Sequence, residues 1–428
     1  MVQEPPRRAS SDEIAPRGQP EERTIVERIL LGQLGANGDC LYATILARQL
    51  RHDHPKAHIT WAISSQCADL LKNNPDIDEI WQIPIAGWEQ HETIWRVFER
   101  EAMRSYVERS YDFVLLSQIW PNNFRNFDGT VRPSILRSYG RPITVPIENV
   151  IRLTPEEIAR VERFVEEQRL RDFEHRILFE CSSKSGQSFV TPELAQEVAR
   201  RVYEILPAAT IIFSTNIPMR LDDKRSRYAG PLSLRETAHL TRDCTLFVGA
   251  GSGGTVAASS TASRPLPMIQ LLSAGTSVFA SFAHDFEYFG IGGRPVLEMT
   301  NEDPGVIADC IATTCREGIE NAMPRFDGRI PVRFDYYFSQ IDRCLLKSYR
   351  FLDAARSLTV TAERYGWTRD LIDFGHAKIA PHLSLDYGWV FAPRRRAGDE
   401  FRALLADVAQ RPADRPVQKG HGGPVGMP

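Results

Sequence analysis

The sequence predicts an α/β protein of two doubly wound domains, followed by a helical C-terminal segment. Short apolar runs alternate with helical stretches from residue 28 to about 150, a polar helical stretch interrupts this alternation, and it restarts at 176. Strands that alternate with helices favour parallel sheets, which bind ligands at the carboxyl ends of their strands. We therefore expect two such sheets, facing each other across a cleft.

The composition excludes several classes of protein. A chain of 428 residues makes two or three domains, and 42% hydrophobic with 25% charged residues is ordinary for a globular protein. The net charge of -3 gives no electrostatic reason to expect nucleic acid. No apolar run reaches the roughly 18 residues of a membrane span. Seven cysteines without a CxxC pair favour a reduced, cytoplasmic compartment.

The first domain is expected over residues 28–150, after a disordered lead-in of residues 1–27 that is rich in Pro, Arg and Glu. A helix should begin at Asp39, and a second should cover 94–107. The irregular stretch 117–150 is expected to form a wall of the site. Strands are predicted at 29–31, 58–63, 79–83 and 111–116.

A linker is expected over 151–175. Thr154 suits an N-cap, Pro155 the first helical position, and two acids follow in the first turn, so a helix should run from here to about 171.

The second domain is expected over 176–330, with helices at 192–206 and 234–240 and strands at 176–180, 210–213, 245–248 and 267–272. Residues 331–392 are helical and aromatic in pattern and suit packing across both domains. Residues 393–428 have the composition of a mostly disordered tail, with one short helix at 400–408.

The segment 28–40 holds the most informative pattern. An apolar strand is followed by a loop with three glycines between Gly32 and Gly38, and Asp39 then opens a helix. Such a loop lets a substrate approach backbone amides at a helix N-terminus. Asp39 is either a helix cap or a catalytic base at this helix N-terminus.

A second glycine cluster spans 247–258, and residues 249–254 satisfy G-x-G-x-x-G. Dinucleotide binding would also need an acid about 20 residues further on, and the first acid there is Asp285. The remaining interpretations are a phosphate site and tight helix–sheet packing through small residues.

A third loop, 180–188, follows a predicted strand. Its hydroxyls, amides and Lys184 suit a diphosphate, although the spacing of a P-loop is missing. A solvated surface loop is the alternative.

Other candidates are weaker. The histidines lack the spacing of metal ligands, and no metal or separate cofactor is predicted. Four tryptophans of the first domain could stack on a sugar ring, although tryptophans at such spacing are more often core residues. They are Trp81, Trp88, Trp95 and Trp120.

Two segments resemble bacterial glycosyltransferase family 9, the ADP-heptose:lipopolysaccharide heptosyltransferases. The resemblance spans about 28–275. The matching stretches are 29–39, 51–55, 59–61 and 74–80 in the first half, and 230–240 with 243–253 in the second.

This resemblance implies a GT-B fold and an inverting, metal-independent transfer of a sugar from a nucleotide-sugar, with Asp39 as general base. The acceptor, a glycan or lipid-linked glycan, would bind the first domain at Gly38, Gln118, Asn122 and Arg125. The donor would bind the second domain at Ser182, Ser183, Lys184, Gln187, Gly249, Gly251, Ser252, Gly253, Gly254 and Thr255. The resemblance also implies that the protein is cytoplasmic, with or without attachment to the inner face of a membrane.

The sequence departs from the family on the donor side. The family's Asp-(Ser/Thr)-Gly-Pro-x-His is replaced over 251–256, which lack the acid and the histidine. Its Lys-Arg-Trp-Pro is absent near Gln187, where Lys184 could substitute. Two alternatives stay open: a catalytically inactive GT-B-like binding or assembly subunit, and a related sugar-nucleotide 2-epimerase.

Overall fold

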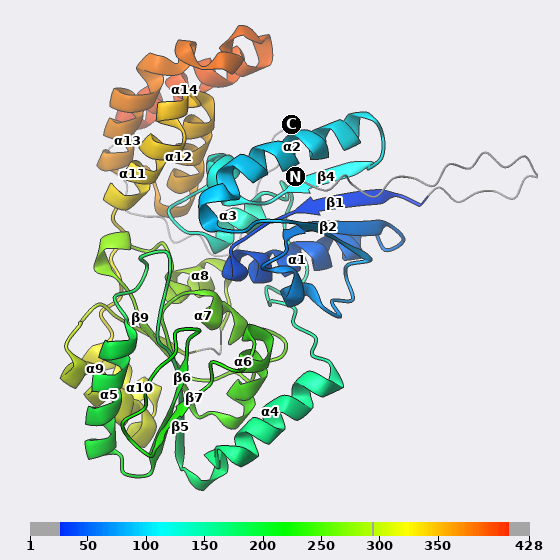
Figure 1. The fold of residues 1–428 in the computed structure, drawn as a ribbon. Coiled ribbons are helices and arrows are strands. Elements are labelled where there is room, and N and C mark those ends of the chain that lie inside the picture. The colour runs from blue at the N-terminus through cyan, green and yellow to red at the C-terminus, as the bar shows by residue number, and fades with distance from the viewer. Residues whose placement is uncertain (1–25, 293–294, 411–428) are drawn as a thin grey trace, which may run out of the picture.

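The computed structural model describes residues 26–292 and 295–410 (Figure 1). It contains two separate parallel sheets with flanking helices, which confirms the predicted fold class. In Figure 1 the first domain, blue to cyan, lies above the green second domain, and the yellow to red C-terminal helices stand beside the first. Within the described residues, no helix combines the length and the apolar composition that a membrane span needs.

The first domain has a four-stranded parallel sheet in the order β3-β2-β1-β4. β1 is central and almost fully buried, as its run of apolar residues requires. The strands are β1 (Arg28–Gly32), β2 (His58–Ser64), β3 (Glu79–Ile83) and β4 (Phe113–Leu116), and the helices are α1 (Asn37–Asp53), α2 (His91–Val107) and α3 (Arg132–Arg137). All four predicted strands are confirmed, and α3 lies in the stretch expected to be irregular.

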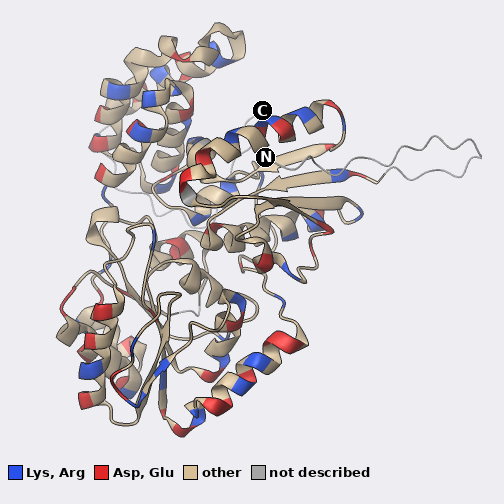
Figure 2. Ribbon diagram, in the orientation of Figure 1, with Lys and Arg blue, Asp and Glu red and all other residues tan. Residues whose placement is uncertain are grey.

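The linker helix α4 (Pro155–Glu167) begins as predicted. The Thr154 hydroxyl accepts the Glu157 amide at 3.2 Å, and the Glu157 carboxylate accepts the Thr154 amide at 2.7 Å, which completes a capping box. Acidic and basic residues alternate along α4 in Figure 2, as expected for a helix with a solvated face. The helix ends four residues earlier than predicted.

The second domain has a six-stranded parallel sheet in the order β10-β9-β8-β5-β6-β7. Counted from β5, this is the strand order 3-2-1-4-5-6 of dinucleotide-binding folds. The strands are β5 (His175–Glu180), β6 (Ala209–Ser214), β7 (Ser226–Tyr228), β8 (Leu246–Gly249), β9 (Met268–Leu271) and β10 (Val296–Met299). The helices are α5 (Pro192–Ile205), α6 (Leu234–Leu240), α7 (Gly253–Ala257), α8 (Phe282–Phe289), α9 (Pro304–Glu317) and α10 (Ile319–Phe326).

The C-terminal segment packs against the first domain. The Ser357 hydroxyl donates to the Phe127 carbonyl at 2.7 Å, and the Tyr337 and Phe127 rings stack with centroids 5.9 Å apart. The α-helices of this segment are α11 (Asp335–Cys344), α12 (Phe351–Tyr365), α13 (Arg369–Phe374) and α14 (Ala392–Gln410).

α14 is a correction to the expected tail. The short helix predicted at 400–408 is part of a longer helix over 392–410. Phe401, Leu405 and Val408 recur at helical spacing and are buried, and in the added N-terminal part Gly398 is buried against Trp389. Residues 1–25 and 411–428, which hold most of the predicted lead-in and the rest of the tail, lie outside the described residues.

Candidate functional site

The first glycine loop connects β1 to α1, and the buried side chain of Gln118 forms hydrogen bonds with it. The Gln118 side-chain carbonyl accepts the Leu34 amide at 2.9 Å, the Gly35 amide at 3.1 Å and the Gln33 side chain at 3.0 Å. Its amide nitrogen donates to the Gly35 carbonyl. Because the side chain is 1% exposed and bonded through both polar atoms, the structure gives it a role in shaping the loop. Acceptor contact, the predicted role, would require these bonds to break.

Asp39 occupies the third position of α1, and Ala36 is the N-cap. Asp39 is therefore not the cap itself. Burial raises the pKa of its carboxyl to about 7, although the positive charge of Arg132 and a hydrogen bond from the Ala36 amide act in the opposite direction. The residue as a whole nevertheless retains some exposure to solvent. A carboxyl group with a pKa near neutral pH has the properties of a general base.

The N-terminus of α1 lies directly against the N-terminus of α7 in the second domain. A Cβ added to Gly38 would lie 3.3 Å from the Cα of Gly253, and one added to Gly253 would lie 3.3 Å from the Cβ of Asn37. The two glycine clusters of the sequence therefore meet across the domain interface. At this point the domains are in van der Waals contact, where the sequence predicted a cleft.

The second glycine loop, between β8 and α7, is occupied by a carboxylate of the protein. Glu180, the last residue of β5, accepts the amides of Ala250 and Gly254 at 2.8 Å each and the Thr255 hydroxyl at 2.7 Å. It also accepts the Ser252 hydroxyl. A phosphate could use these donors only by displacing Glu180, which is 4% exposed.

The glycines of this loop serve close packing. A Cβ on Gly254 would lie 2.3 Å from a Glu180 oxygen, and one on Gly249 would lie 2.5 Å from the Gln270 amide nitrogen. Gly251 has φ +63°, and its amide donates to the Gln270 side-chain carbonyl at 3.1 Å. The structure therefore supports the packing interpretation of the glycine spacing.

The third loop, 181–190, lies at the end of β5 and keeps several polar groups available. Lys184 is exposed, Ser183 is partly exposed, and the Ser182 hydroxyl lies 3.2 Å from that of Thr215. Gln187 is 6% exposed, and its side-chain oxygen is buried without a hydrogen-bond partner among the described residues. Contact of these residues with a ligand stays a prediction.

The sequence analysis missed a buried charge cluster that joins the two domains. Arg132 of α3 donates through Nε to Asp285 of α8 at 2.5 Å, and its guanidinium lies 3.7 Å from the centre of the Phe282 ring. Arg364 of α12 lies 3.1 Å from Asp128 and 3.5 Å from Asp285. These contacts connect the first domain, the second domain and the C-terminal segment.

The cluster sets the protonation of its acids. Burial opposes ionisation of Asp128, but Arg137 and Arg364 hold its pKa well below the ordinary value. For Asp285 burial is the stronger influence and raises the pKa, despite Arg132 and Arg364. The single signal of this cluster in the sequence was the high arginine content of 117–150.

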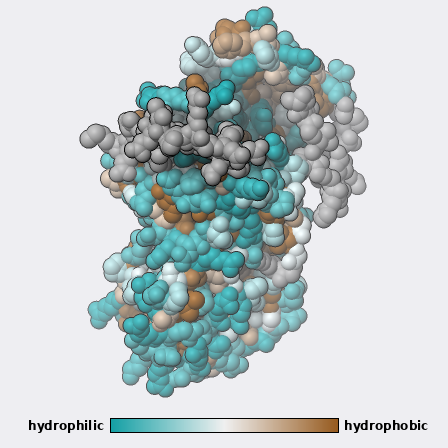
Figure 3. Space-filling view, turned by 90° about the vertical axis from the view of Figure 1, so that its right-hand side faces the viewer, coloured by the Kyte–Doolittle hydropathy of each residue, from teal (hydrophilic) through white to brown (hydrophobic). Residues whose placement is uncertain are grey.

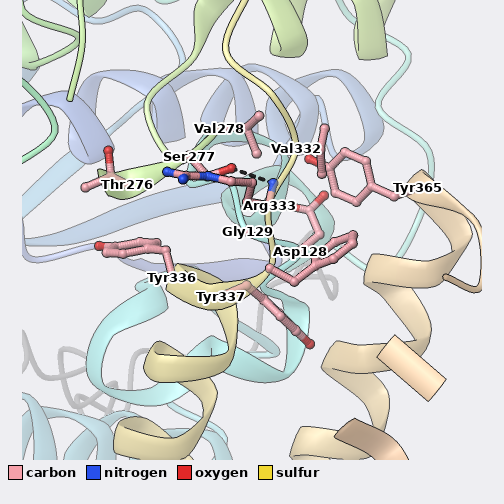
Figure 4. A pocket seen from close by; sticks show the side chains of 11 residues that line it. Asp128, Gly129, Thr276, Ser277, Val278, Val332, Arg333, Tyr336, Tyr337 and Tyr365 are labelled. Carbon is pink, nitrogen blue, oxygen red and sulfur yellow. Dashed lines mark hydrogen bonds between the residues drawn. The ribbon is translucent and has the colours of Figure 1, made fainter. Parts of the chain in front are cut away.

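A small pocket lies beside this cluster (Figure 4). Asp128 and Gly129 line it from the first domain, a turn at 276–278 from the second, and aromatic rings from the C-terminal segment. The Arg333 amide donates to the Ser277 hydroxyl at 2.9 Å across it. None of the predicted site residues lines this pocket.

The remaining predicted residues are placed as follows. Trp81 and Trp95 are core residues, 4% and 0% exposed, which confirms the core interpretation for these two, and Trp120 lies partly buried beside His91. Arg125 is exposed. The side chains of Asn122 and Trp88 lie outside the described part of the structure. Among the described residues, no group of three or more His, Cys, Asp or Glu side chains is arranged to hold a metal ion.

No protein-family model matches this chain, and no curated protein matches it in sequence. Among solved structures, the glycosyl transferase family 9 protein from Veillonella parvula DSM 2008 is similar at 15% identity, with a TM-score of 0.48, over 70% of this chain and 98% of that one. E. coli ADP-heptose LPS heptosyltransferase II is similar at 14% identity, with a TM-score of 0.44, over 70% and 99%.

E. coli heptosyltransferase WaaC, solved with ADP, is similar at 14% identity, with a TM-score of 0.39, over 69% of this chain and 99% of that one. At these identities and TM-scores, a function has to be argued from the residues of the site.

Proposed function

We propose that this chain is an inverting, metal-independent glycosyltransferase that moves a sugar from a nucleotide-sugar to a hydroxyl of a glycan or lipid-linked glycan. The observation that carries the proposal is Asp39, whose pKa is raised to about 7 by burial and which directly follows Gly38, where the two domains meet. A carboxyl with this pKa is ionised in a large fraction of molecules at neutral pH and is basic enough to accept a proton from an alcohol in the transition state.

The chemistry needs one displacement. Asp39 removes the proton of the acceptor hydroxyl while its oxygen attacks the anomeric carbon from the face opposite the diphosphate. The new C–O bond forms as the bond to the diphosphate breaks, the nucleoside diphosphate leaves with the electron pair, and the anomeric configuration inverts. Asp39, a residue at the edge of solvent, then releases its proton to water.

For the donor, the available groups favour the loop after β5. Lys184 is a solvated cation and Ser183 a partly exposed hydroxyl, both at the carboxyl end of a central strand, where ligands of such sheets bind. We assign the diphosphate to Ser182, Ser183 and Lys184. The second glycine loop, with Glu180 in place, would then form the rigid floor beneath the donor.

For the acceptor, Gly38, Asn122 and Arg125 remain the candidates from the first domain. Gly38 is partly exposed next to Asp39, and Arg125 is exposed. Gln118 is assigned to holding the loop that carries Asp39 at its end. α1 and α7 are in contact at Gly38 and Gly253, so the proposal includes a separation of the domains at this point when both substrates bind.

The test compares the unmodified chain with Asp39→Asn. UDP, GDP, ADP, CMP and dTDP are first screened for a rise in melting temperature, which identifies the nucleotide. Transfer is then measured with sugars carried on that nucleotide. We expect Asp39→Asn to lower kcat by about 10²–10⁴-fold while the nucleotide-induced rise persists, since a general base contributes in this range. Near-full activity of the folded variant would refute the role of Asp39.

Glu180 favours a second candidate, a GT-B-like binding or assembly subunit without catalysis. An internal carboxylate occupies the amides and hydroxyls that a diphosphate would otherwise use in the second loop. This candidate predicts that none of the five nucleotides raises the melting temperature. A rise with any of them, followed by transfer, would exclude it.

A further inference from the structure

The C-terminal segment carries a group of exposed apolar side chains that the proposed function does not use. We call it the apolar tip, and it consists of Leu385, Tyr387, Val390 and Phe391, with exposed fractions of 57%, 90%, 71% and 61%. Figure 3 shows a brown, apolar area at the upper end of the molecule, where the C-terminal helices lie in Figure 1. Four such side chains within seven residues form a contiguous patch, which marks an interaction surface.

The tip is held on an ordered scaffold. The buried carboxylate of Asp386 accepts the amide of Gly388 at 2.8 Å and that of Leu352, in α12, at 3.0 Å. Trp389 is only partly exposed, and the Arg402 guanidinium lies 4.9 Å from the centre of its ring. These contacts fix the turn, so the apolar side chains project into solvent from a defined backbone.

Basic residues lie next to the tip. Over 375–398 the sequence has four cationic side chains and one carboxylate, the buried Asp386, and Asp399 and Glu400 follow directly. The arginines at 394–396 are exposed and lie near the start of α14, where cations oppose the helix dipole. Arg396 pairs with Glu400 at 2.8 Å and Arg394 lies 3.9 Å from Asp353, whereas Arg395 forms no ion pair with a described residue. Because these pairs are on the surface, the guanidinium groups can exchange them for an anionic partner.

We propose that the apolar tip docks on an anionic lipid surface. Tyr387, Val390 and Phe391 would enter the boundary between headgroups and acyl chains, and the arginines at 394–396 would bind lipid phosphates. An exposed tyrosine with an apolar body and a polar hydroxyl suits this boundary. The proposal is independent of the proposed function, because the tip shares no residue with the site around Asp39.

The experiment is flotation of the full chain with vesicles of phosphatidylcholine, with or without phosphatidylglycerol. We expect binding to the anionic vesicles, little binding to phosphatidylcholine alone, and loss of binding at about 1 M NaCl, where the Debye length falls to about 3 Å. Absence of a preference for anionic vesicles would overturn the proposal.

Two double variants separate the contributions. Tyr387→Ser with Val390→Ser should weaken binding at least tenfold, and Arg395→Ser with Arg396→Ser by about 25-fold, since each arginine contributes about 1 kcal/mol, or fivefold. Ile217→Ser with Arg220→Ser is the matched control, because it removes an exposed apolar and an exposed basic residue from the second domain. We expect this control to bind like the unmodified chain.

The tip variants must have the same melting temperature as the unmodified chain. We expect this because the substituted side chains are exposed. Unchanged vesicle binding by both tip variants would overturn the proposal. So would a concentration-dependent dimer that the Tyr387→Ser variant abolishes, because the tip would then be an interface for a second copy of this chain.

Discussion

The two glycine loops follow the same local pattern of strand, glycines and helix, but the structure uses them differently. The first loop is braced by the neutral side chain of Gln118, and it leads into the first turn of α1, where Asp39 is a partly exposed residue. The second loop is filled by the carboxylate of Glu180, which accepts two amides and two hydroxyls.

The comparison shows that a glycine loop at a helix N-terminus is not by itself a ligand site. Its amides bind an anion, but that anion can come from the neighbouring strand of the same protein. The residue that follows or ends the adjacent strand decides the outcome: Gln118 follows β4, and Glu180 ends β5. In this chain the first loop leads to Asp39, the base of the proposed function, and the helix after the second loop packs against it from the other domain.

The largest effect should come from Arg132→Met, which tests what supports the first loop across the domain interface. The variant leaves Asp285 buried without its closest cation, so we expect the free energy of unfolding to fall by about 3–5 kcal/mol in urea titrations. The pKa of Asp39 should also rise further, because Arg132 lowers it, and the acid limb of the pH–rate profile should move to higher pH.

The double variant Arg132→Met with Asp285→Asn is the control for this prediction. It removes both charges of the pair, so it should recover much of the lost stability. Equal destabilisation of the single and double variants would mean that Arg132 acts through packing on Phe282.

Glu180→Gln tests the second loop. Each carboxylate oxygen of Glu180 accepts one backbone amide, so in either orientation the amide nitrogen of glutamine would face a group that can only donate, and we expect the free energy of unfolding to fall by about 2–3 kcal/mol. Glu174→Gln is the control, since the Glu174 side chain is 74% exposed. Thermal and urea unfolding should separate the two variants, and equal stabilities would contradict the structural role of Glu180.

Asp39→Asn should make stability less dependent on pH. Burial raises the folded pKa to about 7, above the ordinary 3.8. Between these two pH values the carboxyl ionises in the unfolded chain but stays protonated in the folded one, so the unmodified chain loses stability as the pH rises. With allowance for partial exposure, the variant should gain about 2 kcal/mol over the unmodified chain between pH 5 and 8. Asp222→Asn, at an 81% exposed side chain, should show no such gain in unfolding titrations at the two pH values.

The smallest effect is expected from Gly253→Ala, at the point where the loops meet. Its Cβ would lie 3.3 Å from the Cβ of Asn37 and 3.4 Å from the amide nitrogen of Gly38. We expect a loss of about 1 kcal/mol, seen as a lower melting temperature. Gly328→Ala, which meets nothing within 4 Å, is the comparison, and an equal shift in both variants would argue against close contact between the loops.

Much of the fold follows from local sequence patterns. The apolar runs at β1, β2 and β5 are long enough to identify, and Thr154 with Glu157 signals the start of α4. β7 was missed because Ser226–Tyr228 has three residues and no apolar run. The sequence predicts only the second half of α14, which has helical periodicity. The arginine-rich start of this helix has the composition of a disordered tail.

The site was less accessible from the sequence. The place of Asp39 is set by local signals, and these were sufficient to single it out. Glu180 and Ala250 are 70 residues apart, and Arg132 and Asp285 are 153 apart, so no local pattern shows these contacts. They arise from the packing of strands and domains, and they determine which of the predicted ligand residues are available.

The central claim is that Asp39 is a carboxyl poised to act as a base near neutral pH. Its most direct test is the titration of the aspartate carboxyl carbons by NMR, with Asp39→Asn used to assign the signal. The account predicts a midpoint near pH 7 for Asp39, in line with the burial that raises its pKa. A midpoint near the ordinary value of about 3.9 would contradict it.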